Sequence, residues 1–437
     1  MLSRSLQQIE APPPSASAQF PHGFPSYPQA CAIVLDRVRP SPPGLLLPAF
    51  SALCVLPSHG QGLAGIRGQS GPIHTELLPG GLDAKRDGAG FLFGVGVAGI
   101  YDSNIFLQEN KEVSDFSLVA SPWVNYRSAP VGGARFILGA RYGPFVRTYL
   151  DNSSLNSLDH SGSASLSYAV AKLNLGVNGE YSRISQSDRF AGTVVDASVI
   201  NFGVDGSYQF SQKTSLDASW NASMTDYESS NFSSSDSYIA QLTGFWHATP
   251  LIRLGPSIRH SVLESDNYGD REAWAFLMRL QYEFTGKVDL SASGGLELEE
   301  YSRSGGDTEL KFTGGLTANY AFDALWSFGA GIIYRTLSSP STQNYSINDL
   351  GLTLSVNRAV GASSLRAGVA ANFSDYQSVG PVVVMHEDDQ NFGTFISHRM
   401  GLFDGRVGLN STVRYSKNSG QQDWSRFQVS TGFNYTF

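Results

Sequence analysis

The chain has 437 residues, of which 16% are charged and 12% are aromatic, and it contains 46 glycines. This composition is poor for a helical enzyme. No stretch approaches the roughly 18 to 20 consecutive apolar residues that a membrane-spanning helix needs. The formal net charge is -8 and the 30 lysines and arginines are scattered singly, so no basic stripe could neutralise a phosphate backbone. We therefore expect neither a helical membrane protein nor a nucleic-acid partner.

Residues 1–60 are rich in proline and have no periodic pattern, so they are not expected to form part of the fold. Basic residues precede an apolar run at 44–55, and small residues around Gly60 suit a signal peptidase. We predict a signal or pre-sequence over 1–60, cleaved near Gly60. Because an export signal normally begins at the first residues of a chain, the true start is expected near Val34 or Leu35.

Residues 61–88 are rich in glycine and aperiodic, which indicates a flexible periplasmic lead-in that is too short for a plug domain. The chain has two cysteines, Cys31 and Cys54, and both precede this segment. The remainder can therefore form neither a disulfide nor a cysteine metal cluster.

Residues 89–437 repeat one pattern, in which ten to fourteen residues alternate apolar with small or polar side chains and then a break follows. A strand places alternate side chains on opposite faces, so each segment has one apolar and one polar face. Leu175 and Phe202 belong to the apolar faces of two clear examples. The expected strands are 89–101, 115–127, 134–149, 159–170, 172–183, 198–210, 214–227, 237–248, 251–263, 272–284, 287–301, 309–322, 325–336, 348–357, 364–376, 390–400, 404–416 and 424–437.

The breaks between these strands alternate in length. Short breaks, such as 170–172 and 211–213, alternate with long polar ones, such as 102–115, 184–197 and 377–389. Short periplasmic turns and long outer loops are typical of a closed antiparallel barrel in a bacterial outer membrane, with both termini in the periplasm. Lipid cannot hydrogen-bond an exposed backbone, so a spanning sheet must have no edge. We predict an all-β fold, a closed antiparallel transmembrane β-barrel of about 18 strands over 89–437, with 16 strands as the alternative.

The strands of a soluble sandwich or propeller would also alternate apolar with polar residues. Such a fold predicts shorter strands and no alternation of loop length.

Aromatic residues near strand ends are expected to form girdles at the two membrane interfaces. These residues are Tyr101, Tyr126, Tyr149, Tyr227, Trp246, Tyr301, Trp326 and Trp424. Pro122, Pro144 and Pro256 fall inside expected strands, where they remove ladder donors and predict bulges or register breaks.

The last strand carries alternate apolar residues at Val429, Phe433 and Tyr435 and ends on Phe437. This pattern resembles the C-terminal signature of bacterial outer-membrane barrels, which their assembly machinery recognises. The resemblance implies that these four residues form an assembly signal.

The opening hairpin runs from Phe91 into Tyr101, Asp102, Ser103, Asn104, Ile105 and Phe106, and then into Trp123, Val124, Asn125 and Tyr126. It is similar to the start of the families called putative beta-barrel porins, which are often found near exopolysaccharide genes. The resemblance implies a channel-like barrel and no particular substrate.

The polar faces of the expected strands carry charges that would line the lumen. The basic candidates are Arg135, Arg141, Arg147, Arg253, Arg259, Arg279, Arg335, Arg366, Arg406 and Arg414. The acidic candidates are Glu180, Asp205, Asp217, Glu283, Asp289 and Glu297. Arginines concentrate on the last strands and the first three, whereas acids concentrate on strands five to seven and eleven. Opposed walls of this kind would set up a transverse field that sorts ions, and the alternative is that these charges only pair with their neighbours.

An inward-folded loop could narrow such a pore. The segment Ser378–Met385 is apolar within an otherwise polar break, so it is the candidate. The alternative is that it packs on neighbouring outer loops.

A membrane-embedded hydrolase is the competing class, and it needs a serine, a histidine and an acid within hydrogen-bond reach. The histidines are isolated in sequence, and the alternation places His160, His260 and His398 on or near the lipid face. His247 is expected at a turn and His386 in a loop. We therefore expect no enzyme, no cofactor and no metal site.

The sequence thus favours a porin-like channel for passive passage of polar or charged solutes. The alternative is an accessory or structural barrel of an exopolysaccharide export system. The expected partners are outer-membrane lipid and lipopolysaccharide, the barrel assembly machinery and, for the alternative, polysaccharide export proteins.

Overall fold

The structure is a computed structural model that describes residues 89–128, 135–188, 193–229, 231–265, 270–284, 286–302, 308–338, 345–378, 387–403, 405–420 and 423–437. The predicted pre-sequence and lead-in, residues 1–88, lie outside the described part of the chain.

Eighteen strands and one short 3-10 helix make up the described chain. The strands are β1 (Gly90–Asp102), β2 (Asp115–Arg127), β3 (Arg135–Tyr149), β4 (Ser157–Val170), β5 (Leu173–Asp188), β6 (Thr193–Ser211), β7 (Thr214–Tyr227), β8 (Ser235–Thr249), β9 (Ile252–Ser265), β10 (Arg271–Phe284), β11 (Val288–Tyr301), β12 (Thr308–Ala321), β13 (Trp326–Ser338), β14 (Tyr345–Val360), β15 (Ser363–Ser378), β16 (Asp389–Leu402), β17 (Val407–Ser419) and β18 (Trp424–Thr436). The helix η1 (Ser153–Leu155) lies between β3 and β4. The predicted strand count of 18 is confirmed, and the alternative of 16 is wrong.

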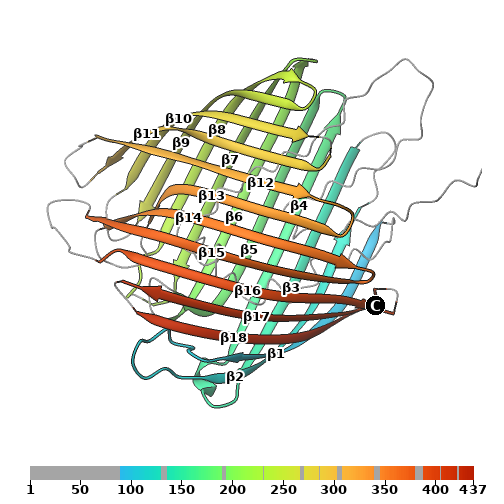
Figure 1. Ribbon diagram of the computed structural model, residues 1–437, viewed down its shortest axis with the longest axis vertical. Coiled ribbons are helices and arrows are strands. Elements are labelled where there is room, and N and C mark those ends of the chain that lie inside the picture. Colours follow the sequence, from blue (N-terminus) through green and yellow to red (C-terminus); the bar gives the residue numbers. More distant parts are fainter. Residues whose placement is uncertain are drawn as a thin grey trace, which may run out of the picture.

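The sheet closes on itself. Each strand pairs antiparallel with its neighbours in the chain, and β1 pairs with β18 from Gly94↔Thr436 to Asp102↔Gln428 (Figure 1). Closure is what removes the two edges that an open sheet would expose. The predicted closed antiparallel barrel is confirmed.

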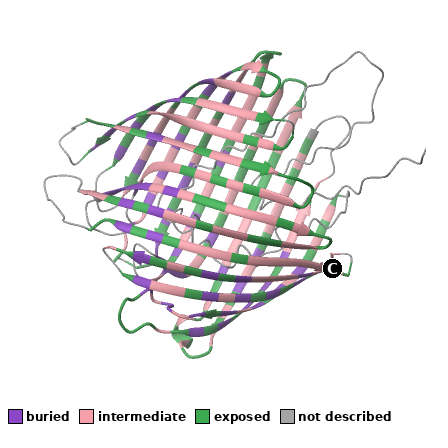
Figure 2. Cartoon of the chain, in the orientation of Figure 1, coloured by how far each residue is buried: buried purple, intermediate pink, exposed green. Residues whose placement is uncertain are grey.

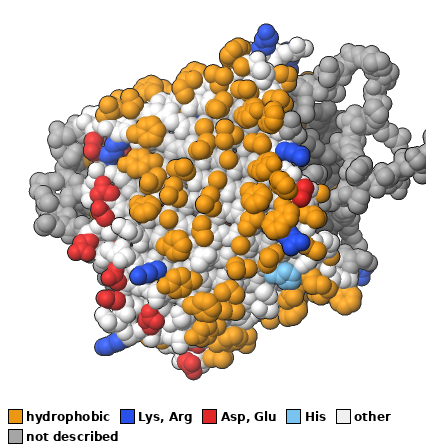
Figure 3. Space-filling view, in the orientation of Figure 1, with side chains coloured by type: hydrophobic (Ala, Val, Ile, Leu, Met, Phe, Trp, Pro, Cys, Tyr) orange, Lys and Arg blue, Asp and Glu red, His pale blue; other side chains and the backbone are white. Residues whose placement is uncertain are grey.

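The outer surface of the barrel is apolar. Side chains at alternate positions point out of the wall, and Figure 3 shows hydrophobic ones spread over the middle of the face in view, with charged ones near its two ends. Leu175 and Phe202, expected on the apolar face, are exposed by 42% and 41% of their surface. A soluble sandwich would bury such residues between its sheets. Of the helices in the described residues, none has the length and apolar character to cross a membrane.

The two ends of the barrel differ. We call the end where β1 begins and β18 ends the turn end, and the opposite end the loop end. Most connections at the turn end are tight, such as the one between β4 and β5 at residues 171–172, whereas β2 and β3 are joined there by the longer segment 128–134. At the loop end, β1 and β2 are joined by residues 103–114. The expected long break at 184–197 is shorter than predicted, because β5 and β6 continue pairing as far as Asp188↔Thr193.

The three prolines interrupt ladders, as predicted, but they do not shift the register. The β2–β3 pairing stops between Ala120↔Val146 and Val124↔Tyr142, where Pro122 and Pro144 lie opposite each other. The β8–β9 pairing stops between Thr243↔Ser257 and Trp246↔Leu254, at Pro256. Each proline lacks the N–H that its ladder would use.

Only part of the predicted aromatic girdle exists. Tyr101, Trp246 and Trp326 lie on the outer face, at the same alternate positions as the apolar side chains. Four of the other predicted members take inward positions instead, where Tyr227, Tyr301 and Trp424 are buried. The fourth is Tyr149, whose hydroxyl accepts a hydrogen bond from Arg147 at 3.1 Å. Proximity to a strand end does not decide which face a side chain occupies, because the alternation does.

Candidate functional site

The inner face of the barrel is identified by side chains that reach across several strands. Arg259 on β9 donates a hydrogen bond to Thr313 on β12 at 3.2 Å. Neighbouring strands lie about 4.8 Å apart, so these two strands are separated by about 14 Å along the wall. Side chains bridge such a separation only where they converge on the concave side. Arg259 and every second residue from it therefore face the lumen.

A buried network of ion pairs lines the loop-end half of the β9–β12 wall. The Arg271 guanidinium contacts Glu297 at 2.5 Å and also pairs with Glu299. Lys311 adds a contact of 2.9 Å to Glu299, and Arg259 pairs with Glu297. The Glu299 side chain is fully buried and that of Arg271 is 4% exposed. Three cations thus surround two carboxylates with little contact to water.

Arg271 is not among the predicted pore-lining residues, because the expected strand begins at residue 272. It is the first residue of β10 and pairs with Tyr301. The signal that could have found it is its spacing, since Arg271, Ala273 and Ala275 occupy alternate positions that all prove to be buried.

The turn-end half of the overlapping β7–β10 wall holds a looser group. The guanidinium groups of Arg253 and Arg279 lie over the Phe245 ring, at 4.8 Å and 5.7 Å from its centroid. Arg253 is 3.7 Å from Asp217, and Arg279 donates to Thr243 at 3.3 Å. An aromatic face attracts a cation through its quadrupole. Phe245 therefore holds two arginines side by side near the turn end.

The other predicted arginines have mixed surroundings. Arg335 lies 3.8 Å from Asp349, and Arg366 lies over the Phe395 ring at 5.5 Å. Arg141 is inward-facing, and its Nη2 is buried without a hydrogen-bond partner among the described residues. Arg147 lies over the Tyr149 ring, and Arg414 is buried on the inner face of β17.

Two predicted arginines need separate mention. Arg406 is exposed in the tight connection between β16 and β17, because β17 begins at Val407. Its predicted place on a pore-lining strand is therefore wrong. Arg135 is the first residue of β3 and pairs with Ala169, but its side chain lies outside the described ones.

The six predicted acids all occupy inward positions. Glu297 and Asp217 are buried and contact the arginines named above. Glu283 and Asp289 are exposed to the lumen near the turn end, where their strands pair residue to residue. Glu180 and Asp205 lie on β5 and β6, at positions of intermediate burial.

The connection between β1 and β2 covers part of the loop-end mouth. The Asn104 side chain donates to the Ser425 carbonyl on β18 at 3.0 Å, and the Ile105 carbonyl accepts from Ser187 on β5 at 2.6 Å. Five strand spacings, about 24 Å along the wall, separate β18 from β5. Two consecutive residues can contact both strands only by lying across the opening. We call residues 103–114 the mouth loop.

The predicted narrowing segment, Ser378–Met385, lies outside the described residues except for Ser378, the last residue of β15.

The lumen is less polar than expected. Apolar clusters lie on inward positions, one formed by Ala98, Ile100, Val119 and Phe145. Figure 2 shows that buried residues gather toward the loop end, so this half of the lumen is the more densely filled.

The histidines lie largely where the alternation placed them. His160, His260 and His398 take outward positions, where His398 contacts the Ser363 hydroxyl at 2.6 Å and His260 contacts Glu272 at 2.9 Å. His247 lies near the end of β8, beside a register irregularity, and His386 lies outside the described residues. Within the described ranges, no group of three or more potential ligands could hold a metal ion.

The fold and its inner face define a class of protein, a closed transmembrane β-barrel with a charged lumen. Residues 145–242 match a protein family described as "Putative MetA-pathway of phenol degradation". This stretch runs from the end of β3 into β8. No curated protein matches the chain.

Several solved structures are similar to this chain at low sequence identity. OccK5 (OpdH) of Pseudomonas aeruginosa is 9% identical with a TM-score of 0.46, over 79% of this chain and 98% of that one. The outer membrane protein opdK of the same organism is 12% identical with a TM-score of 0.45, over 80% and 99%. OccAB4 of Acinetobacter baumannii is 10% identical with a TM-score of 0.43, over 81% and 100%. The assignment of the fold rests on the strand pairing itself.

Proposed function

We propose that this protein is a passive channel of a bacterial outer membrane, through which small polar or charged solutes pass along a water-filled lumen. The observation that carries the proposal is the closed 18-stranded wall with an apolar outer face and arginines and carboxylates on its inner face. Barrels of this strand number leave room for an aqueous channel, whereas eight-stranded ones are filled by their own side chains.

The distribution of lumen charge supports selectivity that depends on charge. On the β9–β12 wall the carboxylates of Glu297 and Glu299 are already paired with cations. Arg141 and Arg366 have no carboxylate partner among the described residues, so no neighbouring carboxylate neutralises their charge, and Arg366 is also exposed. The transverse field expected from the sequence is therefore supported on the arginine side and weakened on the β11 side.

The proposal includes the orientation of the barrel in the membrane and the assembly signal in its last strand. With short turns on the periplasmic side, both ends of the barrel chain would face the periplasm. The outward positions of Val429, Phe433 and Tyr435 and the exposed Phe437 suit recognition by an assembly machinery. The cleaved pre-sequence over 1–60 remains a prediction from the sequence.

Electrical recording tests the channel directly. Purified barrel is added to planar bilayers, and current is measured in a gradient of potassium chloride. Stepwise conductance with a reversal potential on the anion side supports the proposal. Heat-modifiable migration on a gel shows that the barrel in the membrane is folded. If folded barrel gives no conductance steps, the proposal is contradicted.

A second candidate is an accessory barrel of an exopolysaccharide export system. It rests on the resemblance of the opening hairpin, in which Asp102 at the end of β1 and Asn104 in the mouth loop are buried. Cross-linking in the intact envelope, followed by identification of the partners, separates it from a free-standing channel. A stable complex with export proteins and no conductance by the isolated barrel would favour this candidate.

A further inference from the structure

The wall between β12 and β13 is paired over only part of its height. Register partners run from Ala321↔Ser327 at the turn end to Gly314↔Tyr334, and the pairing then stops. On the loop-end side of this point, Thr308–Thr313 pair only with β11, and Arg335–Ser338 pair only with β14. The last link is a hydrogen bond of 3.4 Å from the Thr313 hydroxyl to the Tyr334 carbonyl. Two strand edges therefore face each other without a ladder.

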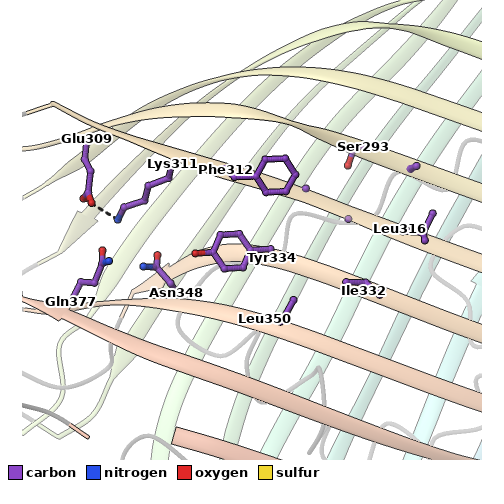
Figure 4. A pocket seen from close by; sticks show the side chains of 13 residues that line it. Ser293, Glu309, Lys311, Phe312, Leu316, Ile332, Tyr334, Asn348, Leu350 and Gln377 are labelled. Carbon is purple, nitrogen blue, oxygen red and sulfur yellow. Dashed lines mark ion pairs between the residues drawn. The ribbon is translucent and has the colours of Figure 1, made fainter. Parts of the chain in front are cut away.

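A cavity of about 700 Å³ occupies this break. Its lining includes inward positions, among them Ser293 and Lys311, and outward positions, among them Phe312 and Ile332. Because its lining comes from both faces of the sheet, this cavity lies between the two strand edges, where the wall has no ladder. Figure 4 shows Phe312 and Tyr334 on opposite sides of the break, with Lys311 and Asn348 toward its loop-end side.

The break lies at the height of the apolar belt. Leu310 and Phe312, which flank it on the outer face of β12, are exposed by 59% and 58% of their surface. Alternate residues of an antiparallel strand direct their N–H and C=O groups to the same neighbour, so part of Thr308–Thr313 presents unpaired groups to the break. Lipid cannot satisfy such groups, and they are tolerated at membrane depth only where they line a wet or polar cavity.

The Phe312 ring lies on the β11 side of the break. A Cβ added to Gly294 on β11 would come within 3.4 Å of the Phe312 ring, so the ring lies over this glycine. A larger residue at Gly294 would push the ring away from β11. The absence of a side chain there lets Phe312 lean back from β13.

We propose that the break between β12 and β13 is a lateral opening through which small neutral amphipathic molecules pass between the lumen and the hydrocarbon of the membrane. The inference rests on the proposed placement in a membrane and goes beyond passage along the lumen. The apolar body of such a molecule would contact Phe312, Leu316 and Ile332, and its hydroxyl, amide or carbonyl group would meet Ser293 or Asn348.

The preference for a neutral molecule follows from the charges of the lining. Glu309 and Lys311 are its two charged members, and their side chains are 3.2 Å apart. Lys311 also contacts Glu299 at 2.9 Å. An anion or cation would have to break these pairs, whereas a neutral polar group can form hydrogen bonds without doing so. A volume of this size falls in the range of small-molecule sites.

Closing the opening with a reversible bond tests the proposal. If the β12–β13 ladder continued, Phe312 would face Thr336, and both side chains point outward. The variant Phe312→Cys with Thr336→Cys is therefore made in a chain in which Cys31 and Cys54 are serine. The matched control is Ala318→Cys with Ala330→Cys, a pair that is already in register on the same two strands. Where the sulfurs of the first pair are too far apart to oxidise, a short bismaleimide bridges them.

The probe is N-phenyl-1-naphthylamine, a neutral aromatic amine that fluoresces in hydrocarbon, added to cells that lack other porins. Oxidising the Phe312/Thr336 pair should reduce probe entry to the rate of cells without the barrel, reductant should restore it, and the control pair should have no effect. Uptake of lactose, which uses the lumen, should stay unchanged in both.

Three results separate the possible failures. Unchanged probe entry after closure, or a parallel loss of lactose uptake, overturns the lateral opening. Probe entry that responds to closure in cells that take up no lactose leaves the opening intact and contradicts the proposed channel. As an independent variant, Gly294→Val should slow probe entry by moving the Phe312 ring into the break, and an unchanged rate would count against the proposal.

Discussion

The two halves of the lumen use the same kinds of residue in different ways. In the loop-end half, Arg271 and Glu299 are buried within a network that spans β9 to β12. In the turn-end half, Glu283, Asp289 and Arg366 are exposed. A buried charge depends on its partner, whereas a hydrated one is free to interact with solutes. The buried loop-end charges are therefore expected to contribute to stability, whereas the exposed charges near the turn end are hydrated.

The largest expected effect is on stability, from removing one cation of the loop-end network. Arg271→Met leaves Glu297 and Glu299 with fewer partners and should lower the free energy of unfolding by about 3–5 kcal/mol. Guanidinium unfolding in detergent micelles measures the change. Arg366→Met, in the turn-end half, is the control and should shift stability by no more than about 0.5 kcal/mol. Equal losses for the two variants would remove the distinction between the halves.

The second effect concerns the mouth loop, which lies across the loop-end opening. Replacing residues 105–112 by a short Gly-Ser linker removes the contact of Ile105 with Ser187. Single-channel conductance should rise by about twofold or more, because current depends on the narrowest open cross-section. A conductance that does not change would show that the narrowest point lies elsewhere. Asn104→Ala removes the link to Ser425 and two hydrogen bonds with the Gln108 backbone but keeps the loop, so it should give a smaller rise.

The third effect concerns ion selectivity. Arg141 has no carboxylate partner among the described residues, whereas Arg259 is paired with Glu297. Arg141→Ala should therefore move the reversal potential toward cation preference, and Arg259→Ala should move it less. Recordings in a potassium chloride gradient measure both. Unchanged selectivity in the two variants would reject a role for the lumen field.

The smallest effect is expected at Phe245, which lies under Arg253 and Arg279. Phe245→Leu keeps an apolar side chain but removes the ring, and the loss of cation–π attraction at a site of this kind is about 0.5–2 kcal/mol. Chemical unfolding should detect a decrease of that size while the reversal potential stays within error. A loss as large as that of Arg271→Met would place Phe245 with the structural residues of the loop end.

The sequence predicted the barrel well because alternation and break length are local properties. The ladder interruption at Pro122 and Pro144 could also be predicted, since a missing N–H belongs to the residue itself. The inward Tyr227 and Trp424 could not be placed from proximity to a strand end, and Arg271 was assigned to a loop. Strand ends shift by a few residues, and a residue near such an end changes its environment with each shift.

By itself, the sequence determined the class of fold, an approximate number of strands and the face that most side chains occupy, because each strand carries its own two-residue period. Only the tertiary structure decided which charges meet. Arg259 and Thr313 lie on strands three apart, Ile105 reaches Ser187 across the mouth, and the β12–β13 ladder stops at Gly314. These contacts depend on the curvature and closure of the sheet, which bring together residues that no local pattern relates.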